Sequence, residues 1–376
     1  MEADVLVIGA GIVGLSIAYN LAEMGCKKII VTEKEFAGAG TTGKGGGGIR
    51  HQFSTELNIK LTIESLNLLK RFKDLTGYDP QLKSISYYLL ATEEEEALLR
   101  RSVDAQIKQG LHSTLIEPSE LKPILKGVKL DDIAAVSTCR EDSWINPPTL
   151  LQGYYDSCIR LGVSILEHTE VKHLRKEGCL RAETTVGHID AETVVIAAGA
   201  YSGLIGKSIG VEIPIQPFKR QVFYVEGLDK VAEPNLVLFD LHNKVALVNR
   251  VEGPIVGIHD KSTLGSFDET LNLNDAPYVK EVAAQRIPPI KKAELTGGIA
   301  GLYEMTPDRN PIIGKIASVE GLFCAAGFSG HGIMHAPIIG KIIAEMIVKD
   351  KPSIDISQFS INRFSNNKQV YEHIVI

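Results

Sequence analysis

The sequence predicts an α/β protein with a second, α+β domain, and three observations lead to this fold class. Residues 4–8 (DVLVI) form a short apolar run followed at once by glycines, as in a buried strand that ends in a turn. Residues 192–198 and 321–326 repeat the pattern of an apolar run before small residues. Residues 218–260 alternate in the manner of antiparallel strands.

The turn after the first predicted strand reads GAGIVG, the spacing of a dinucleotide-binding fingerprint. Gly9 allows the tight turn, Gly11 lets a diphosphate approach the backbone, and Gly14 lets the following helix pack on the strand. Ile12 and Val13 open that helix, whose first N–H groups favour an anion. The motif predicts a Rossmann-like domain.

Glu33 ends the second predicted strand, residues 28–32, at the distance of about 20 residues that the fingerprint expects. A carboxylate at this place accepts hydrogen bonds from ribose hydroxyls and repels a 2′-phosphate, so the ligand is FAD or NAD rather than NADP. Lys34 follows it as a further candidate contact. A ligand-free glycine turn is the alternative, and the strand–helix–strand context with its terminal acid disfavours it.

Composition and charge exclude several classes of protein. The net charge of −6 and pI of about 6.0 give no sign of a nucleic-acid partner. No apolar run reaches the roughly 18 residues of a membrane span. Five cysteines, with no close pair, argue against a disulfide framework and a zinc site. We therefore expect a cytoplasmic protein without a metal.

Motifs spread along the chain carry a resemblance to a known family. They are VIGAGIVGLSIAYNLAEMG, GGGGIRHQF, EDSWINPPTLLQGY, VVIAAGAYS, GLYEMTPDRNPIIG and GLFCAAGFSGHGIMHAPIIGK. The chain resembles the D-amino-acid oxidase superfamily of flavoproteins, in its sarcosine oxidase and L-proline dehydrogenase β-subunit branch. The resemblance implies an FAD-binding domain over residues 1–85, 147–215 and 298–376. It also implies a substrate domain, with an antiparallel sheet and helices, over 86–146 and 216–297, in which residues 93–125 are helical.

The resemblance assigns further positions to FAD. Val171 is expected at the adenine, and Ala198 and Gly199 at the diphosphate. A helix over residues 338–348, beginning near Pro337, is expected to point its positive end at the flavin. Gly301 stands where some relatives carry the cysteine that attaches FAD, which predicts non-covalent FAD. The loop expected at the pyrimidine end of the flavin contains Gly327, Phe328, Ser329, Gly330, His331, Gly332 and Ile333.

The loop GAGTTGKGGGGIR, residues 38–50, nearly matches a phosphate-binding P-loop. Gly45 replaces the Ser or Thr that would bind magnesium, and glycines follow where a helix should begin, so a P-loop hydrolase is disfavoured. We interpret the segment as a loop that passes the diphosphate and reaches the flavin, with glycines where the backbone approaches the cofactor. Its candidate cofactor contacts are Thr41, Thr42, Lys44, Gly46, Gly47 and Gly48.

Arg50, at the end of this loop, is the main candidate for binding the substrate. The resemblance implies that it grips a carboxylate, which suits the planar fork of a guanidinium. Tyr303 is expected to line the same pocket and His51 to flank the flavin ring, while Tyr224 and Arg250 are weaker candidates. All of these side chains have an ordinary structural alternative.

The predicted function is FAD-dependent oxidation of a small amino acid or N-alkyl amino acid, of proline or sarcosine type, to the imine by hydride transfer to flavin N5. Met334 replaces a carboxylate-binding lysine of relatives, and Lys244 and Lys261 are only marginal matches to the lysine that promotes reaction with O₂. A dehydrogenase is therefore favoured over an oxidase. The electron acceptor would be a partner subunit or a quinone- or dye-like carrier, and an oligomer is possible. A 2-hydroxy-acid or glycerol-phosphate oxidoreductase, and an inactive flavin-holding subunit, are the alternatives.

Overall fold

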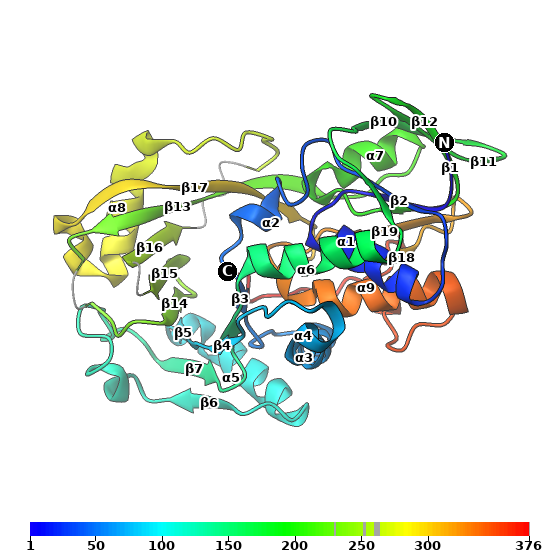
Figure 1. Cartoon of the computed structure of the whole chain (residues 1–376). Helices are drawn as coiled ribbons and strands as arrows, with labels where there is room; N and C mark the ends of the chain where they lie inside the picture. The colour runs from blue at the N-terminus through cyan, green and yellow to red at the C-terminus, as the bar shows by residue number, and fades with distance from the viewer. Residues whose placement is uncertain (229–230, 251–252, 259–263, 376) are drawn as a thin grey trace.

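Two eight-stranded sheets and a small third sheet organise the chain in a computed structural model that describes all residues except 229–230, 251–252, 259–263 and 376. In Figure 1 the first sheet lies on the right, with the N-terminus, and the second on the left. The long strands β13 (Gln216–Glu226) and β17 (Glu294–Met305) pair along their whole length and run from the second sheet towards the first.

The first sheet has the order β10-β11-β12-β1-β2-β9, with β19 beside β12 and β18 beside β19. Its central strands β12, β1, β2 and β9 are parallel, as the apolar, β-branched runs of the sequence predicted. The carboxyl ends of β1 and β2 open towards the glycine turn and Glu33. The strands are β1 (Glu2–Ile8), β2 (Ile29–Thr32), β9 (Ser164–Leu166), β10 (Val171–Glu177), β11 (Cys179–Thr184), β12 (Gly187–Ile196), β18 (Ile312–Lys315) and β19 (Leu322–Ala326).

The second sheet has the order β17-β13-β16-β15-β14-β5-β7-β6 and is antiparallel except between β14 and β5. One face packs against α8 (Ala276–Arg286) in a separate hydrophobic core that includes Phe223, Leu247 and Val256. The small third sheet joins β3 (Gly48–Ile49), β8 (Ser143–Trp144) and β4 (Lys83–Ser84). The remaining strands are β5 (Ser86–Ala91), β6 (Ser113–Ile116), β7 (Ala135–Cys139), β14 (Leu236–Asp240), β15 (Val245–Arg250) and β16 (Gly253–Ile258).

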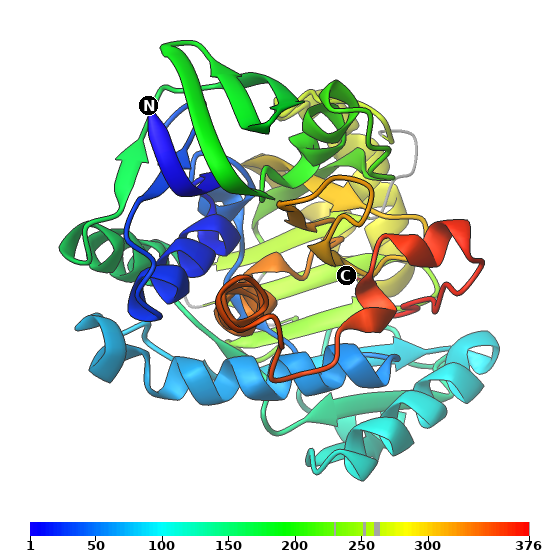
Figure 2. The same ribbon diagram turned by 90° about the vertical axis from the view of Figure 1, so that its right-hand side faces the viewer.

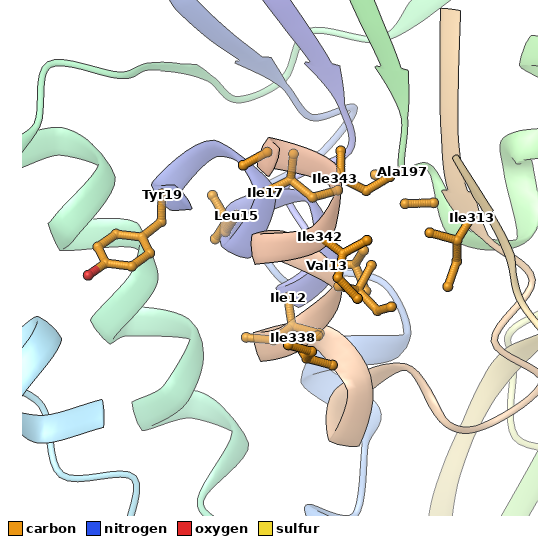
Figure 3. Packing of buried hydrophobic residues seen from close by; sticks show 14 of the residues in the cluster. Ile12, Val13, Leu15, Ile17, Tyr19, Ala197, Ile313, Ile338, Ile342 and Ile343 are labelled. Atoms are coloured by element: carbon orange, nitrogen blue, oxygen red, sulfur yellow. The ribbon is translucent and has the colours of Figure 1, made fainter. Parts of the chain in front are cut away.

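Helix α1 (Ile12–Glu23) packs against α9 (Gly332–Lys349) in the core of the first domain. Figure 3 shows the interdigitating apolar side chains, with Ile12 beside Ile338. The helices approach closely at Gly340, where an added Cβ would lie 2.1 Å from Ser16 Oγ. Figure 2 views α9 along its axis, with α1 and α3 beside it. The other helices are α2 (Thr41–Lys44), α3 (Glu56–Lys70), α4 (Phe72–Thr76), α5 (Glu93–Lys108), α6 (Pro147–Arg160), α7 (Ser202–Ser208) and α10 (Asn362–Ser365).

Two predicted elements were wrong in their extent. Helix α9 begins at Gly332, before Pro337, because Met334, Ala336 and Ile338 are buried in the core, which offsets the backbone hydrogen bond that Pro337 removes. Residues 93–125 are not helical throughout, since β6 follows α5 and pairs with β7. The predicted fold class is confirmed. The predicted domain boundaries stay a prediction, although β17 crosses the boundary at 298.

No helix within the described residues is both long and apolar enough to span a membrane. All five cysteines, which are described, are unpaired.

Candidate cofactor and substrate site

A cavity of about 850 Å³ lies between the first and second sheets. Its walls come from the glycine turn after β1, the loop of residues 38–50, the start of α9 and the inner face of the second sheet. The lining includes most of the sequence-predicted site: Gly9, Gly11, Ile12, Val13, Glu33, Lys34, Thr41, Thr42, Lys44, Gly46, Gly47, Gly48, Arg50, Val171, Ala198, Gly199, Gly301, Tyr303, Phe328, Gly330, His331, Gly332 and Ile333. Gly14, His51, Gly327 and Ser329 do not belong to it.

The glycine turn has the geometry that its sequence predicted. Gly9 adopts a φ of +110°, and a Cβ there would lie 2.4 Å from the carbonyl oxygen of Ala197. A Cβ on Gly14 would lie 1.9 Å from the carbonyl oxygen of Gly9, so the helix and the turn meet without room for a side chain. The N-terminus of α1 at Gly11 therefore opens directly on the cavity.

Glu33 lies beside this turn at the end of β2. Its Oε2 accepts a hydrogen bond from the backbone N–H of Ala10 (3.0 Å), and its Oε1 accepts one from the N–H of Glu35 (3.1 Å). The carboxylate thus stabilises the conformation of the glycine turn besides lining the cavity. The sequence predicted its contact with ribose but gave no sign of this second role.

The loop of residues 38–50, which the sequence predicted to pass the diphosphate, contains a short helical turn. Residues Thr41–Lys44 form the helical turn α2, in which Thr42 Oγ1 accepts from the N–H of Ile12 (3.1 Å) and Thr41 Oγ1 donates to the carbonyl of Leu302 (2.7 Å). Lys44 forms an ion pair with Glu269, so this ammonium is directed to a protein carboxylate.

Two of the loop glycines are required by contacts with the protein itself. A Cβ on Gly47, whose φ is +77°, would lie 2.2 Å from the carbonyl oxygen of Ile145. A Cβ on Gly48 would lie 1.8 Å from the hydroxyl of Tyr87. The sequence predicts glycine here for the approach of the cofactor, and the structure gives a different reason at both positions.

Arg50 is almost completely buried and lines the cavity. Its Nη2 donates to the carbonyl of Ile374 (2.9 Å), its Nη1 donates to the carbonyl of Gln52, and its guanidinium stacks on Phe53 at 4.3 Å. Burial lowers the pKa of Arg50, and the charges of Glu372 and Asp142 oppose that shift. No carboxylate in the described part of the chain accepts a hydrogen bond from it, so its positive charge remains available to an anion.

Tyr303 and Arg220 form a second polar group in the cavity. Arg220 on β13 is buried, donates to the carbonyl of Ile258 (2.6 Å), and lies 5.3 Å from the centre of the Tyr303 ring. Burial lowers its pKa, and the interaction with Tyr303 opposes that shift. The sequence analysis missed Arg220, although the alternation of β13 places it on the same face as Val222, which also lines the cavity.

Three buried histidines, His51, His331 and His335, lie near Arg50. The ring of Phe53 is 4.9 Å from that of His331 and 5.4 Å from that of His335. Burial, followed by the charge of Arg50, lowers the pKa of His331 well below its usual value and that of His335 to about 3. His51 is fully buried, and its N–H donates to Asp142 Oδ1 (2.7 Å). Because His51 does not line the cavity, its position beside the flavin stays a prediction.

Glu304 is a cavity carboxylate that the sequence analysis did not select. Its Oε2 accepts a hydrogen bond from the N–H of Gly327 (2.8 Å), close to the start of α9. Burial raises the pKa of this carboxyl to about 7, and the hydrogen bonds from the backbone of Gly327 and Phe328 only partly oppose the shift. The position of Glu304 next to Tyr303 in GLYEMTPD was a signal that could have found it.

The cavity fits FAD. The turn at Gly9 and Gly14 has no room for side chains, the N-terminus of α1 faces the cavity, and Glu33 lies where a ribose is expected. Residues 4–346 match a family model described as FAD dependent oxidoreductase. The chain belongs to this family of FAD-dependent oxidoreductases. FAD is its cofactor, and the resemblance to the D-amino-acid oxidase superfamily is confirmed.

Known relatives of this FAD-dependent oxidoreductase extend along its whole length. An L-proline dehydrogenase from P. horikoshii has a similar structure, with 31% identity, a TM-score of 0.88, and coverage of 98% of this chain and 99% of its own. A glycine oxidase from Geobacillus kaustophilus is 27% identical over 96% of this chain and 97% of its own length. A sarcosine oxidase subunit beta from Rhodobacter capsulatus is 27% identical over 99% of this chain and 91% of its own length.

Proposed function

We propose that the protein oxidises the C–N bond of an amino acid or N-alkyl amino acid to the imine. The observation that carries this proposal is Arg50, a buried guanidinium that lines the FAD cavity and makes its hydrogen bonds to two backbone carbonyls. A substrate carboxylate would supply the counter-charge that these carbonyls do not. The names of the similar proteins, which act on proline, glycine or sarcosine, support an amino-acid substrate.

The chain's residues have separable tasks in this reaction. FAD, when bound, accepts the hydride equivalent that leaves the α-carbon. Arg50 would hold the carboxylate bidentately and so fix the α-carbon, and Tyr303 would limit the pocket on the side of β17. The amine must arrive neutral, since its lone pair forms the C=N bond as the Cα–H bond breaks. The iminium product then loses its proton to water, and water hydrolyses the imine.

The finer parts of this proposal concern FAD attachment and the electron acceptor. None of the five cysteines lines the described cavity, which supports non-covalent FAD. Of the two lysines considered for promoting reaction with O₂, Lys244 does not line the cavity and Lys261 lies outside the described residues. We therefore propose a dehydrogenase that passes electrons to another carrier, in keeping with a relative that is named as a subunit.

Anaerobic mixing with candidate substrates tests the function. We expect proline, N-methyl amino acids or other small amino acids to bleach the oxidised-flavin absorbance, and 2-hydroxy acids and glycerol phosphate to leave it unchanged. Bleaching by a hydroxy acid alone would overturn the proposal, as would failure of every amino acid to reduce the flavin. Air is then admitted to the reduced enzyme. The flavin of a dehydrogenase should stay reduced, whereas O₂ should rapidly reoxidise the flavin of an oxidase.

A further inference from the structure

The inner face of the second sheet forms an apolar wall of the cavity, made by Val222, Val237, Val248, Ile255 and Ile299. Each of these residues comes from a different strand, β13 to β17. All but Val237 are half-buried, so they still present surface to the cavity. We call these five side chains the apolar wall.

The strand register places the wall residues in two adjacent rows of the sheet. Val248 pairs directly with Ile255 on one side and with Val237 on the other, and Val222 pairs with Ile299. Small residues continue the row of Ile299 and Val222, since Gly257 pairs with both Val222 and Ala246. Side chains alternate along each strand, so the neighbours of the wall residues point to the other face and pack in the core that includes α8.

The wall ends beside the candidate carboxylate site. Val237 pairs with Tyr87 on β5, and Tyr87 also lines the cavity. The hydroxyl of Tyr87 reaches Gly48, two positions before Arg50, and the charge of Arg50 acts on Tyr87. A ligand whose carboxylate is held by Arg50 therefore has the apolar wall next to it.

We propose that the substrate carries an apolar side chain or ring of at least three carbons, which the apolar wall covers. The inference rests on the proposed function and narrows its substrate class. Glycine and sarcosine would leave the apolar wall exposed to water. Each methylene of a larger substrate that is buried against the wall would strengthen binding by about fourfold. A polar side chain of the substrate would lose its hydrogen bonds to water at the apolar wall, and the valine and isoleucine side chains offer no hydrogen-bond partner in exchange.

Arg220 and Arg250, which line the cavity at the edges of the wall, define the competing possibility. A substrate with two carboxylates could pair one with Arg50 and the other with either of these cations. Arg250 donates a hydrogen bond to the carbonyl of Gly46 and lies 5.8 Å from the centre of the Trp144 ring. Arg220 donates to the carbonyl of Ile258 and lies over the ring of Tyr303. Five apolar residues in two adjacent rows of the sheet favour the single-carboxylate substrate.

A chain-length series on the FAD-loaded enzyme tests the proposal. Acetate, propionate, butyrate and pentanoate are titrated, and the Kd of each is read from the perturbation of flavin absorbance. We expect the Kd to fall about fourfold for each added methylene. Val248→Thr, which keeps the shape of the side chain, should flatten the series. Val186→Thr is the matched control, because Val186 is exposed and lies outside the cavity, so its series should stay steep.

A Kd that stays constant or rises with chain length would overturn the proposal, as would unchanged steepness in Val248→Thr. Succinate is the probe for a second carboxylate, and tighter binding of succinate than of butyrate would also overturn it. This experiment needs no turnover. A steep series in an enzyme whose flavin no amino acid reduces would leave the apolar wall standing and remove the proposed reaction, so the two failures are distinguishable.

Discussion

The Nη2 of Arg50 donates to the carbonyl of Ile374 at 2.9 Å, although the two residues are 324 positions apart. Glu372, which is fully buried, holds the segment around Ile374 in place through hydrogen bonds. Its carboxylate accepts hydrogen bonds from the backbone N–H groups of Ser54 (2.9 Å) and Thr55 (3.1 Å) and from both hydroxyls. The segment of residues 370–374 therefore orients Arg50, and its carboxylate lies at the N-terminus of α3.

Glu372→Gln tests this arrangement. The substitution keeps the shape of the side chain but removes the charge that accepts hydrogen bonds from Ser54 and Thr55 and that acts on Arg50 at longer range. We expect the free energy of unfolding to fall by about 2 kcal/mol. KM for an amino-acid substrate should rise more than kcat falls, because Arg50 is less well oriented.

Urea unfolding and steady-state kinetics measure these two effects. Glu320→Gln is the control, since Glu320 is exposed and the substitution changes the net charge by the same amount. A loss of stability in Glu372→Gln without any change in KM would show that the segment supports the fold and does not position Arg50.

Arg50→Lys tests the carboxylate site itself. Lysine keeps the positive charge but lacks the planar fork that binds a carboxylate through two donors. We expect KM to rise by about 30-fold, because one hydrogen bond to a charged group, worth roughly 2 kcal/mol, is lost, with unchanged FAD content. Arg101→Lys on the exposed face of α5 is the control. An unaltered KM in Arg50→Lys would remove this arginine from the pocket.

Glu33→Ala tests the other end of the cavity. The substitution removes a candidate ribose contact and the acceptor for the N–H groups of Ala10 and Glu35. We expect FAD to bind more weakly by about 30-fold, from the loss of roughly 2 kcal/mol of hydrogen bonding to a charged group. Flavin fluorescence on dilution reports the release. Full flavin occupancy in dilute Glu33→Ala would contradict the assignment.

The sequence predicted the parts of the site that local patterns carry. The fingerprint at Gly9 and Gly14 and the acid at Glu33 lie in one strand–helix–strand unit, so spacing alone places them relative to one another. Helix α9 was placed too late because Pro337 favours the first turn of a helix, while in the fold the preceding turn packs in the core and the N–H of Ile338 contacts Ser65 of another helix. That contact has no local signal.

The contacts that shape the pocket join segments far apart in the chain. The hydroxyl of Tyr87 lies against Gly48, Lys44 forms an ion pair with Glu269, and Arg50 donates a hydrogen bond to Ile374. Each depends on how β5, the segment before α8 or the segment after α10 folds back on the cavity. Periodicity predicts which face of a strand is buried, but not which strand lies opposite, so these partners could be found only in the three-dimensional arrangement.

Gly340→Ala tests the packing of α9 on α1. The added Cβ would lie 2.1 Å from Ser16 Oγ and 2.6 Å from the Ser16 backbone, so the helices must separate. We expect a loss of about 2 kcal/mol in the free energy of unfolding, as in other overpacked cores. Gly40→Ala is the control, because no atom lies within 4 Å of its added Cβ. Equal stability of the two variants would contradict the close approach seen at Gly340.

Glu304 should make the stability of the protein depend on pH. Burial raises the pKa of its carboxyl from 4.5 to about 7, so between these values the folded chain binds more protons than the unfolded chain. The protonated carboxyl therefore contributes on the order of 3 kcal/mol to the free energy of unfolding. This contribution is fully present below pH 4.5 and is lost as the pH rises through about 7. Glu304→Gln should remove this slope, whereas Glu294→Gln, at an exposed position of the same strand, should keep it. Urea unfolding across this pH range measures it, and an equal slope in wild type and Glu304→Gln would assign the dependence to another group.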